Sequence, residues 1–145
     1  MKRVRGCVFP GDRAYHVDYN VWVRPHAPGV VTLGATSYGV ALAIEFFAFL
    51  PKPVGMLIEA GRAVGLLELS KTMVSVRSPV AGTIVEVNAQ AAARPALITE
   101  DPYGAGWLVR IATDTGLHGL LSGDAVYSAF ETAMAIENFE GLAVR

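Results

Sequence analysis

The sequence predicts a mainly β fold, a small sandwich or barrel with an N-terminal hairpin, one short helix and a C-terminal α-helix. Two observations carry this prediction. Between residues 54 and 111, short apolar runs alternate with Gly and Pro, a rhythm typical of small sandwiches and barrels with tight turns. Between residues 122 and 136, the apolar residues recur at the spacing of one helix face.

The N-terminal part predicts a hairpin followed by a short helix. Residues 21–23 and 30–33 are β-branched runs separated by a Pro-Gly turn, as in two strands joined by a loop of several residues. Thr36 or Ser37 is suited to cap a helix over residues 38–42.

Further strands are predicted along the rest of the chain. They cover residues 44–50, 54–58, 64–69, 72–76, 83–87 and 107–111. Proline cannot donate to a ladder, so Pro51 ends the first of them, while Pro95 limits a short helical stretch over residues 89–93. Asp124 is the expected N-cap of the C-terminal helix, whose apolar face carries Val126, Phe130, Ala133 and Met134.

Length and composition exclude several classes of protein. The 145 residues predict one domain spanning residues 1–145, and an apolar share of 52% excludes a disordered chain. Twelve basic residues are offset by thirteen acidic ones, which argues against nucleic-acid binding. The longest apolar stretch, residues 40–50, is too short to span a membrane, and no secretory signal is seen. We expect a cytoplasmic protein, in which the single Cys7 forms no internal disulfide and has no assigned role.

No catalytic residue and no metal site is predicted. His16, His26 and His118 lie far apart in the sequence, without the spacing of metal ligands. The glycines stand in isolated turns rather than in a phosphate-binding loop, and no serine lies in a nucleophile elbow. The chain is therefore not expected to be an enzyme.

Lys71 is the strongest candidate for a functional residue. Nine of the twelve basic residues are Arg, which leaves only Lys2, Lys52 and Lys71. Lys71 lies between two predicted strands, so it is expected at a hairpin turn, where its four-carbon stem extends into solvent and is suited to carry a covalently attached group. The alternative is an ordinary exposed lysine in a turn.

The segment around Lys71 resembles the swinging-arm signature of lipoyl and biotinyl carriers. The signature is Glu68-x-x-Lys71 followed by Ser78-Pro79-Val80-Ala81-Gly82. It leaves three options: a biotinyl carrier, a lipoyl domain of a 2-oxoacid dehydrogenase, or an H-type protein of glycine cleavage. The biotinyl motif has Met on both sides of its lysine, whereas this chain has Ser70 and Thr72, so biotin is disfavoured.

The flanking segments resemble the glycine cleavage H-protein family over about residues 15–130. They are residues 20–24, 85–88, 95–98 and above all 100–108, which contain Asp-Pro-Tyr-Gly-Ala-Gly-Trp. The resemblance implies a barrel-sandwich hybrid with lipoate attached to Lys71 through an amide. It also suggests that Glu68 helps to present the turn to the lipoylating enzyme.

The resemblance implies a carrier function with two possible pathways. H-proteins shuttle an aminomethyl group and reducing equivalents between glycine-decarboxylase, aminomethyltransferase and dihydrolipoyl-dehydrogenase enzymes. The segment 5–10, Phe49 and the segment 73–77 depart from that pattern, and the departures are similar to those of H-like lipoate-binding proteins linked to a heterodisulfide-reductase-like complex in sulfur oxidation. A third hypothesis is an H-like binding module that carries no lipoate.

Overall fold

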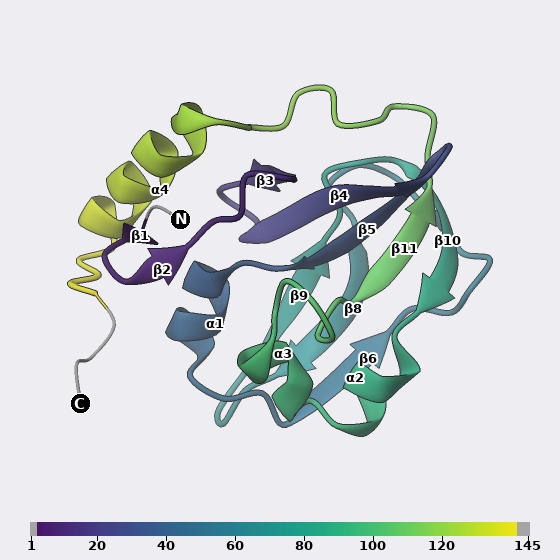
Figure 1. Cartoon of the computed structure of the whole chain (residues 1–145). Coiled ribbons are helices and arrows are strands. Elements are labelled where there is room, and N and C mark those ends of the chain that lie inside the picture. Colours follow the sequence, from purple (N-terminus) through teal and green to yellow (C-terminus); the bar gives the residue numbers. More distant parts are fainter. Residues whose placement is uncertain (1–2, 142–145) are drawn as a thin grey trace.

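The computed structural model describes residues 3–141 and is mainly β (Figure 1). Its elements in chain order are β1 (Arg3–Val4), β2 (Cys7–Val8), β3 (Ala14–His16), β4 (Val21–Ala27), β5 (Val30–Ala35), α1 (Ser37–Ala43), β6 (Ala48–Pro51), β7 (Leu57–Ile58), β8 (Ala63–Glu68), β9 (Met73–Arg77), β10 (Gly82–Val87), α2 (Ala89–Ala93), α3 (Ala96–Glu100), β11 (Val109–Ala112) and α4 (Asp124–Ile136). The predicted mainly β fold, with its N-terminal hairpin, short helix and C-terminal helix, is confirmed.

The strands form two larger antiparallel sheets and one small one. The six-stranded sheet has the order β3-β4-β5-β11-β10-β7, the three-stranded sheet has the order β6-β8-β9, and β1 pairs with β2. The predicted hairpin corresponds to β4 and β5, although β4 continues through Pro25 to Ala27. Proline is tolerated there because β3 pairs only with residues 21–23, so beyond Val23 one edge of β4 is free.

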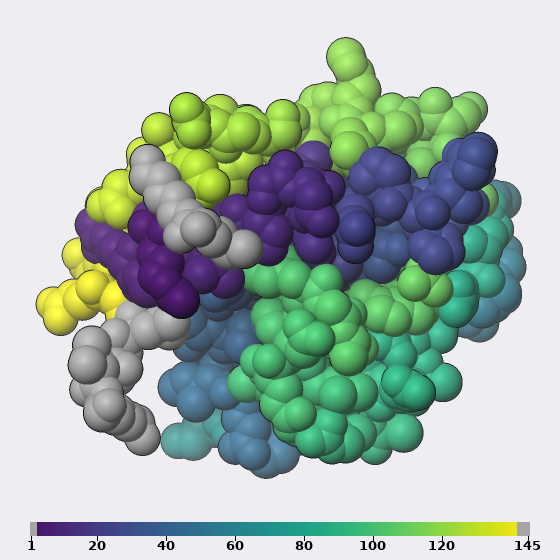
Figure 2. Space-filling view, in the orientation of Figure 1, coloured from purple at the N-terminus to yellow at the C-terminus, as the bar shows by residue number. Residues whose placement is uncertain are grey.

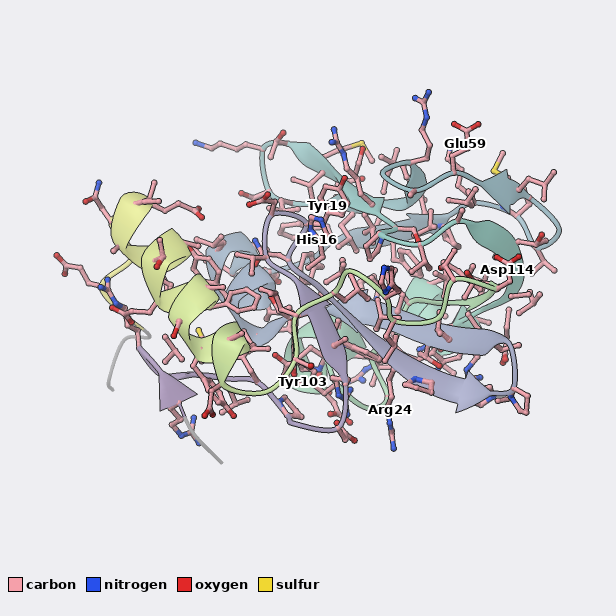
Figure 3. All side chains as sticks on the ribbon, turned by 90° about the horizontal axis from the view of Figure 1, so that it is seen from above. His16, Tyr19, Arg24, Glu59, Tyr103 and Asp114 are labelled. Carbon is pink, nitrogen blue, oxygen red and sulfur yellow. The ribbon has the colours of Figure 1, made fainter. Side chains whose placement is uncertain are left out.

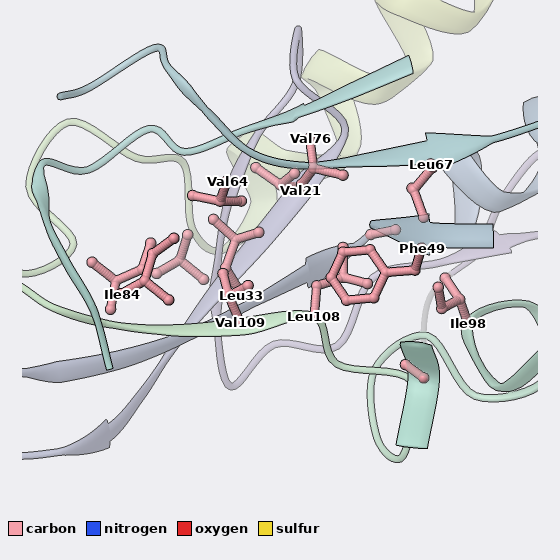
Figure 4. Close-up of a cluster of buried hydrophobic side chains, with 14 of the residues drawn as sticks. Val21, Leu33, Phe49, Val64, Leu67, Val76, Ile84, Ile98, Leu108 and Val109 are labelled. Atoms are coloured by element: carbon pink, nitrogen blue, oxygen red, sulfur yellow. The ribbon is translucent and has the colours of Figure 1, made fainter. Parts of the chain in front are cut away.

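The main core lies between the two larger sheets. Val64, Leu67 and Val76 of the three-stranded sheet face Leu33 and Val109 of the six-stranded sheet, and all five are almost completely buried (Figure 4). Buried and half-buried residues alternate along β11, whereas a register shift between Ala63 and Gly65 interrupts the alternation in β8. Each sheet nevertheless places one apolar face on the core. The β8–β9 hairpin is thus attached to the core through the buried side chains of its two strands.

A second core lies beside the sheets, between α4, α1 and the N-terminal segment. Phe130 of α4 stacks on Phe9, with ring centroids 4.2 Å apart, and makes edge contacts with Tyr15 and Tyr38. Figure 1 places α4 next to β1 and β2, and Figure 2 shows the N-terminal segment lying between α4 and the strands. The predicted apolar face of α4 is buried at Val126, Phe130 and Met134.

Two predicted strands are much shorter than expected. The prediction of a strand over residues 44–50 is wrong at its start, because α1 is capped by Ile44 and pairing with β8 begins only at Ala48. The prediction for residues 54–58 is wrong at its start as well, because Gly55, at a φ of 94°, lies in a turn. Regular pairing with β10 is limited to Leu57 and Ile58, although Gly55 and Met56 still hydrogen-bond to Ile84. Apolar character alone does not show which residues of a run find a partner strand.

Three smaller predictions also require correction. Asp124 is not the N-cap of α4, since Gly123 occupies that position. Asp124 lies in the first turn, where its negative carboxylate interacts favourably with the positive end of the helix dipole. Pro95 limits α2 as predicted, but it also begins the helix α3, for which proline is well suited because its missing N–H needs no partner at a helix start. The last strand of the sheet begins at Val109 and does not include Trp107.

Gly82 is required by the close approach of β10 and β11. A Cβ atom built on Gly82 would overlap the carbonyl oxygen of Ala112 and press on the side chain of Ile111. We expect Gly82→Ala to lower the free energy of unfolding by about 2–4 kcal/mol, because backbone atoms of the ladder must shift to accept the methyl group.

Urea unfolding measures this loss, with Gly11→Ala as the matched control. A Cβ on Gly11 meets nothing within 4 Å, and the residue is exposed, so this variant should be nearly as stable as the parent chain. Equal stability of Gly82→Ala and Gly11→Ala would contradict the prediction.

Candidate functional site

The lysine singled out by the sequence lies at the tip of the β8–β9 hairpin. Glu68 pairs with Met73, and the backbone N–H of Leu69 donates to the carbonyl oxygen of Thr72 at 2.8 Å, so Ser70 and Lys71 are the two central residues of the turn. Lys71 is exposed and no hydrogen bond or ion pair is seen for its side chain within residues 3–141. A lysine held there by two paired strands presents its amine to solvent from a rigid hairpin.

Glu68 borders the same turn but does not contact Lys71 through a hydrogen bond or ion pair. Its carbonyl oxygen accepts a hydrogen bond from the backbone N–H of Phe47 at 2.8 Å, and its side chain is exposed. The segment that leads into β6 is thereby attached to the base of the hairpin, on the side opposite β9.

The second half of the signature lies at the other end of β9. Ser78 is completely buried; its Oγ donates to the carbonyl oxygen of Val80 at 2.6 Å and accepts the N–H of the same residue at 3.2 Å. Its backbone N–H donates to the carbonyl oxygen of Arg62. This turn therefore joins β9 to β10 as a structural feature and does not share a site with Lys71.

A groove opens directly beside the hairpin. Its volume is about 450 Å³, and Leu69 and Val74, which flank the turn on both strands, belong to its wall. Residues of α1 and of the segment after it form the opposite side, among them Leu42 and Phe46. The only charged residues among the described ones that line it are Asp18 and Arg77, so the groove suits an apolar group held on a long chain from Lys71.

A stacked aromatic pair borders this groove. The rings of His16 and Tyr19 lie 3.8 Å apart and nearly parallel (Figure 3), and Nδ1 of His16 accepts the backbone N–H of Tyr19 at 3.2 Å. Burial lowers the pKa of His16 below its usual value of 6.5, while the nearby Asp18 opposes this shift. The neutral imidazole is therefore the form that the fold accommodates.

The protein should lose stability as His16 is forced to protonate. Below a pH of about 6.5 the unfolded chain binds more protons at this residue than the folded chain, so stability is present above that value and declines as the pH falls through it. Urea unfolding between pH 7.5 and pH 5 should show a decline of at most about 1.4 kcal/mol per pH unit from this group, and His16→Gln should flatten it. An identical pH profile in His16→Gln would contradict the assignment.

The Asp-Pro-Tyr-Gly-Ala-Gly-Trp segment proves to be structural. The Tyr103 hydroxyl donates to the carbonyl oxygen of Val8 at 2.6 Å and accepts the N–H of Ser37 at 2.9 Å. Nε1 of Trp22 donates to the carbonyl oxygen of Pro102 at 3.0 Å, and the Arg13 guanidinium stacks on the rings of both Trp22 and Tyr103. These contacts attach the segment to the second core, and Figure 3 shows Tyr103 well away from Tyr19, which lines the groove.

The remaining sequence candidates do not assemble into a second site. Among residues 3–141 no group of three or more His, Cys, Asp or Glu residues is placed to hold a metal ion. Cys7 is buried in the second core, and burial raises the pKa of its thiol, although a hydrogen bond with Ser37 opposes the shift. Within the same range, no helix is both long and apolar enough to cross a membrane.

Comparisons of sequence and of structure with known proteins indicate the same family. The family model described as "Glycine cleavage H-protein" matches residues 13–132. Glycine cleavage system H protein 5 of Aquifex aeolicus is 39% identical over 115 residues, 77% of each chain, and probable glycine cleavage system H protein 2 of Saccharolobus solfataricus is 33% identical over 135 residues, 90% of this chain and 91% of that protein. The crystal structure of a glycine cleavage system H protein from Mycobacterium marinum has a TM-score of 0.73 and 36% identity, covering 83% of this chain and 96% of that one.

A barrel-sandwich hybrid that presents one lysine on an exposed hairpin defines a swinging-arm carrier domain. The comparisons then identify the kind of carrier. The chain belongs to the glycine cleavage H-protein family, whose members are lipoyl carriers rather than catalysts. None of the relatives named above points to sulfur oxidation, so that alternative gains no support.

Proposed function

We propose that Lys71 carries a lipoyl group and that the chain shuttles a fragment of substrate and reducing equivalents between the enzymes of glycine cleavage. The observation that supports this most directly is the exposed Lys71 at the tip of a paired hairpin in a chain of this family. The largely apolar groove beside the turn fits the attached group, because it could receive an apolar ring on a chain that begins at Lys71.

Attachment requires an activated lipoyl carboxyl group supplied by a lipoylating enzyme. Nζ of Lys71 would attack the carbonyl carbon, the activating group would leave with the bonding electrons, and Nζ would give up a proton as the amide forms. The dithiolane of lipoate then supplies a sulfur that accepts the transferred fragment and a pair of thiols that can be reoxidised. The chain itself contributes the attachment point at Lys71, the rigid hairpin that holds it and the groove beside that hairpin.

Glu68 is proposed to help present this turn. Its exposed carboxylate lies three residues before Lys71, at the end of β8, while its backbone is held on both sides by Met73 and Phe47. A charge at this place is available to a lipoylating enzyme without any rearrangement of the hairpin. The partners proposed are that enzyme and the glycine-decarboxylase, aminomethyltransferase and dihydrolipoyl-dehydrogenase enzymes of the family's pathway.

Intact-mass and peptide mass spectrometry of the chain produced in a lipoylating host test the proposal. The expected result is one lipoyl group per chain, located on Lys71. The lipoylated protein should then accept the aminomethyl group when it is offered glycine and the glycine-decarboxylase component. Unmodified Lys71 under these conditions would overturn the proposal and favour the H-like binding module that carries no lipoate.

A further inference from the structure

The end of α1 contains a strained turn at Ile44. Its φ of 69° and ψ of −54° correspond to the rare γ-turn with a positive φ, and the N–H of Glu45 donates to the carbonyl oxygen of Ala43 at 2.8 Å across this turn. A β-branched residue is the least suited to such a backbone, since its Cβ substituents meet the following peptide group. Glycine would adopt the same conformation without this strain.

The fold obtains no burial from Ile44 in return. The residue is 80% exposed, so its side chain makes little contact with the core and would lose little if it were removed. Backbone strain that persists in a protein commonly marks a functional position. An exposed aliphatic side chain at a strained position is best explained by a contact outside the chain.

Ile44 lies between Ala43 and Phe46, and these two neighbours line the groove beside the lysine hairpin. We use the name apolar rim for three exposed apolar residues of this region. The rim consists of Ile44, Phe47 and Met73, of which Phe47 is 51% and Met73 45% exposed. The backbone hydrogen bond from Phe47 to Glu68 and the pairing of Glu68 with Met73 place the segment after α1, the base of the hairpin and the start of β9 next to one another. In Figure 1 the connection from α1 to β6 runs beside the β8–β9 turn.

The chemistry at Lys71 restricts which partner must touch this rim. An enzyme that forms the amide has to bring its reacting carbon to Nζ, only ~6 Å from the backbone along a four-carbon stem. Its surface must therefore surround the turn. An enzyme that acts on the dithiolane works at the far end of the completed arm and can keep its body away from the hairpin.

We infer that the rim of Ile44, Phe47 and Met73 is the docking surface for the lipoylating enzyme, with Ile44 as its main apolar contact. This inference rests on the proposed lipoylation of Lys71 and specifies the partner's surface: an apolar ring around the entrance that receives the lysine. A few apolar residues at the centre of an interface commonly carry most of its affinity.

The test uses the unmodified full-length chain, a purified lipoate–protein ligase, lipoate and ATP, with intact mass as the readout of the initial rate. Ile44→Gly should lower kcat/KM for lipoylation ~10-fold, while its thermal unfolding midpoint stays equal to or rises above that of the parent chain because the strain is relieved. The matched control is Leu57→Ser, which removes an aliphatic side chain that is 81% exposed on β7 of the other sheet, and its rate should not change.

The outcomes separate the inference from the proposed function. An unchanged rate for Ile44→Gly, with the parent chain modified normally, overturns the docking surface alone. A parent chain that is not modified overturns both. If Ile44→Gly does not fold, the rate of lipoylation of Phe47→Ser is measured in its place and is expected to fall. An unchanged rate in that variant also overturns the inference.

Discussion

Lys71→Arg should abolish lipoylation completely while leaving the fold unchanged. The guanidinium group of Arg keeps the positive charge but stays protonated, so it cannot serve as the nucleophile that forms an amide. Lys71 is exposed and its side chain makes no hydrogen bond or ion pair with the described residues, so the free energy of unfolding should change by less than about 0.5 kcal/mol. Intact mass and urea unfolding measure the two effects separately.

Lys52→Arg provides the matched control. Lys52 is also exposed and also lies near a strand end, between Pro51 and Pro53, but it is not in the hairpin turn. This variant should be modified to the same extent as the parent chain. A lipoyl group on the Lys71→Arg chain, or its loss in Lys52→Arg, would show that another lysine is the attachment site.

Phe130→Ala should be among the most destabilising substitutions in the chain. Phe130 is completely buried, stacks on Phe9 and touches the edges of Tyr15 and Tyr38, so its removal leaves a cavity among three aromatic rings. Substitutions of buried phenylalanine by alanine commonly cost about 3–5 kcal/mol, a large part of the stability of a domain of this size. Urea unfolding measures the loss directly.

Ile136→Ala on the same helix is the control. Ile136 is 76% exposed, so the loss of its side chain removes little buried area, and the free energy of unfolding should change by less than about 0.5 kcal/mol. A loss below 1 kcal/mol for Phe130→Ala would mean that α4 does not depend on its contact with the N-terminal segment.

Local patterns were sufficient wherever the deciding interactions lie close together in the chain. The β8–β9 hairpin follows from two apolar runs on either side of Ser70 and Lys71, and its turn is closed within four residues. The cap of α1 follows from Thr36, whose Oγ1 accepts the N–H of Gly39 at 3.0 Å. The buried face of α4 follows from the spacing of Val126, Phe130 and Met134.

Patterns failed where a distant partner decides the outcome. Segment 44–47 has the composition of a strand, but β8 ends at Glu68, opposite Ala48, so the residues before Ala48 have no strand to pair with. Ile44 instead caps the end of α1. No local pattern indicates the N-terminal strands β1 and β2, because each has only two residues and is stabilised by contacts with α1 and α4. No period in the sequence signals such contacts.

The candidate lysine, the hairpin around it and the family of the chain can be inferred from the amino-acid sequence alone, because they depend on residues that are near neighbours or on long ordered motifs. The structural roles of the Ser-Pro-Val-Ala-Gly turn and of the Asp-Pro-Tyr-Gly-Ala-Gly-Trp segment, in contrast, are evident only from their hydrogen bonds in the folded chain. The groove beside the hairpin and the γ-turn at Ile44 are likewise visible only in the folded chain. Pairing between β6 and β8 brings together residues that are 14 to 20 positions apart in the sequence, and the positions of side chains across such a pairing depend on packing rather than on local preference.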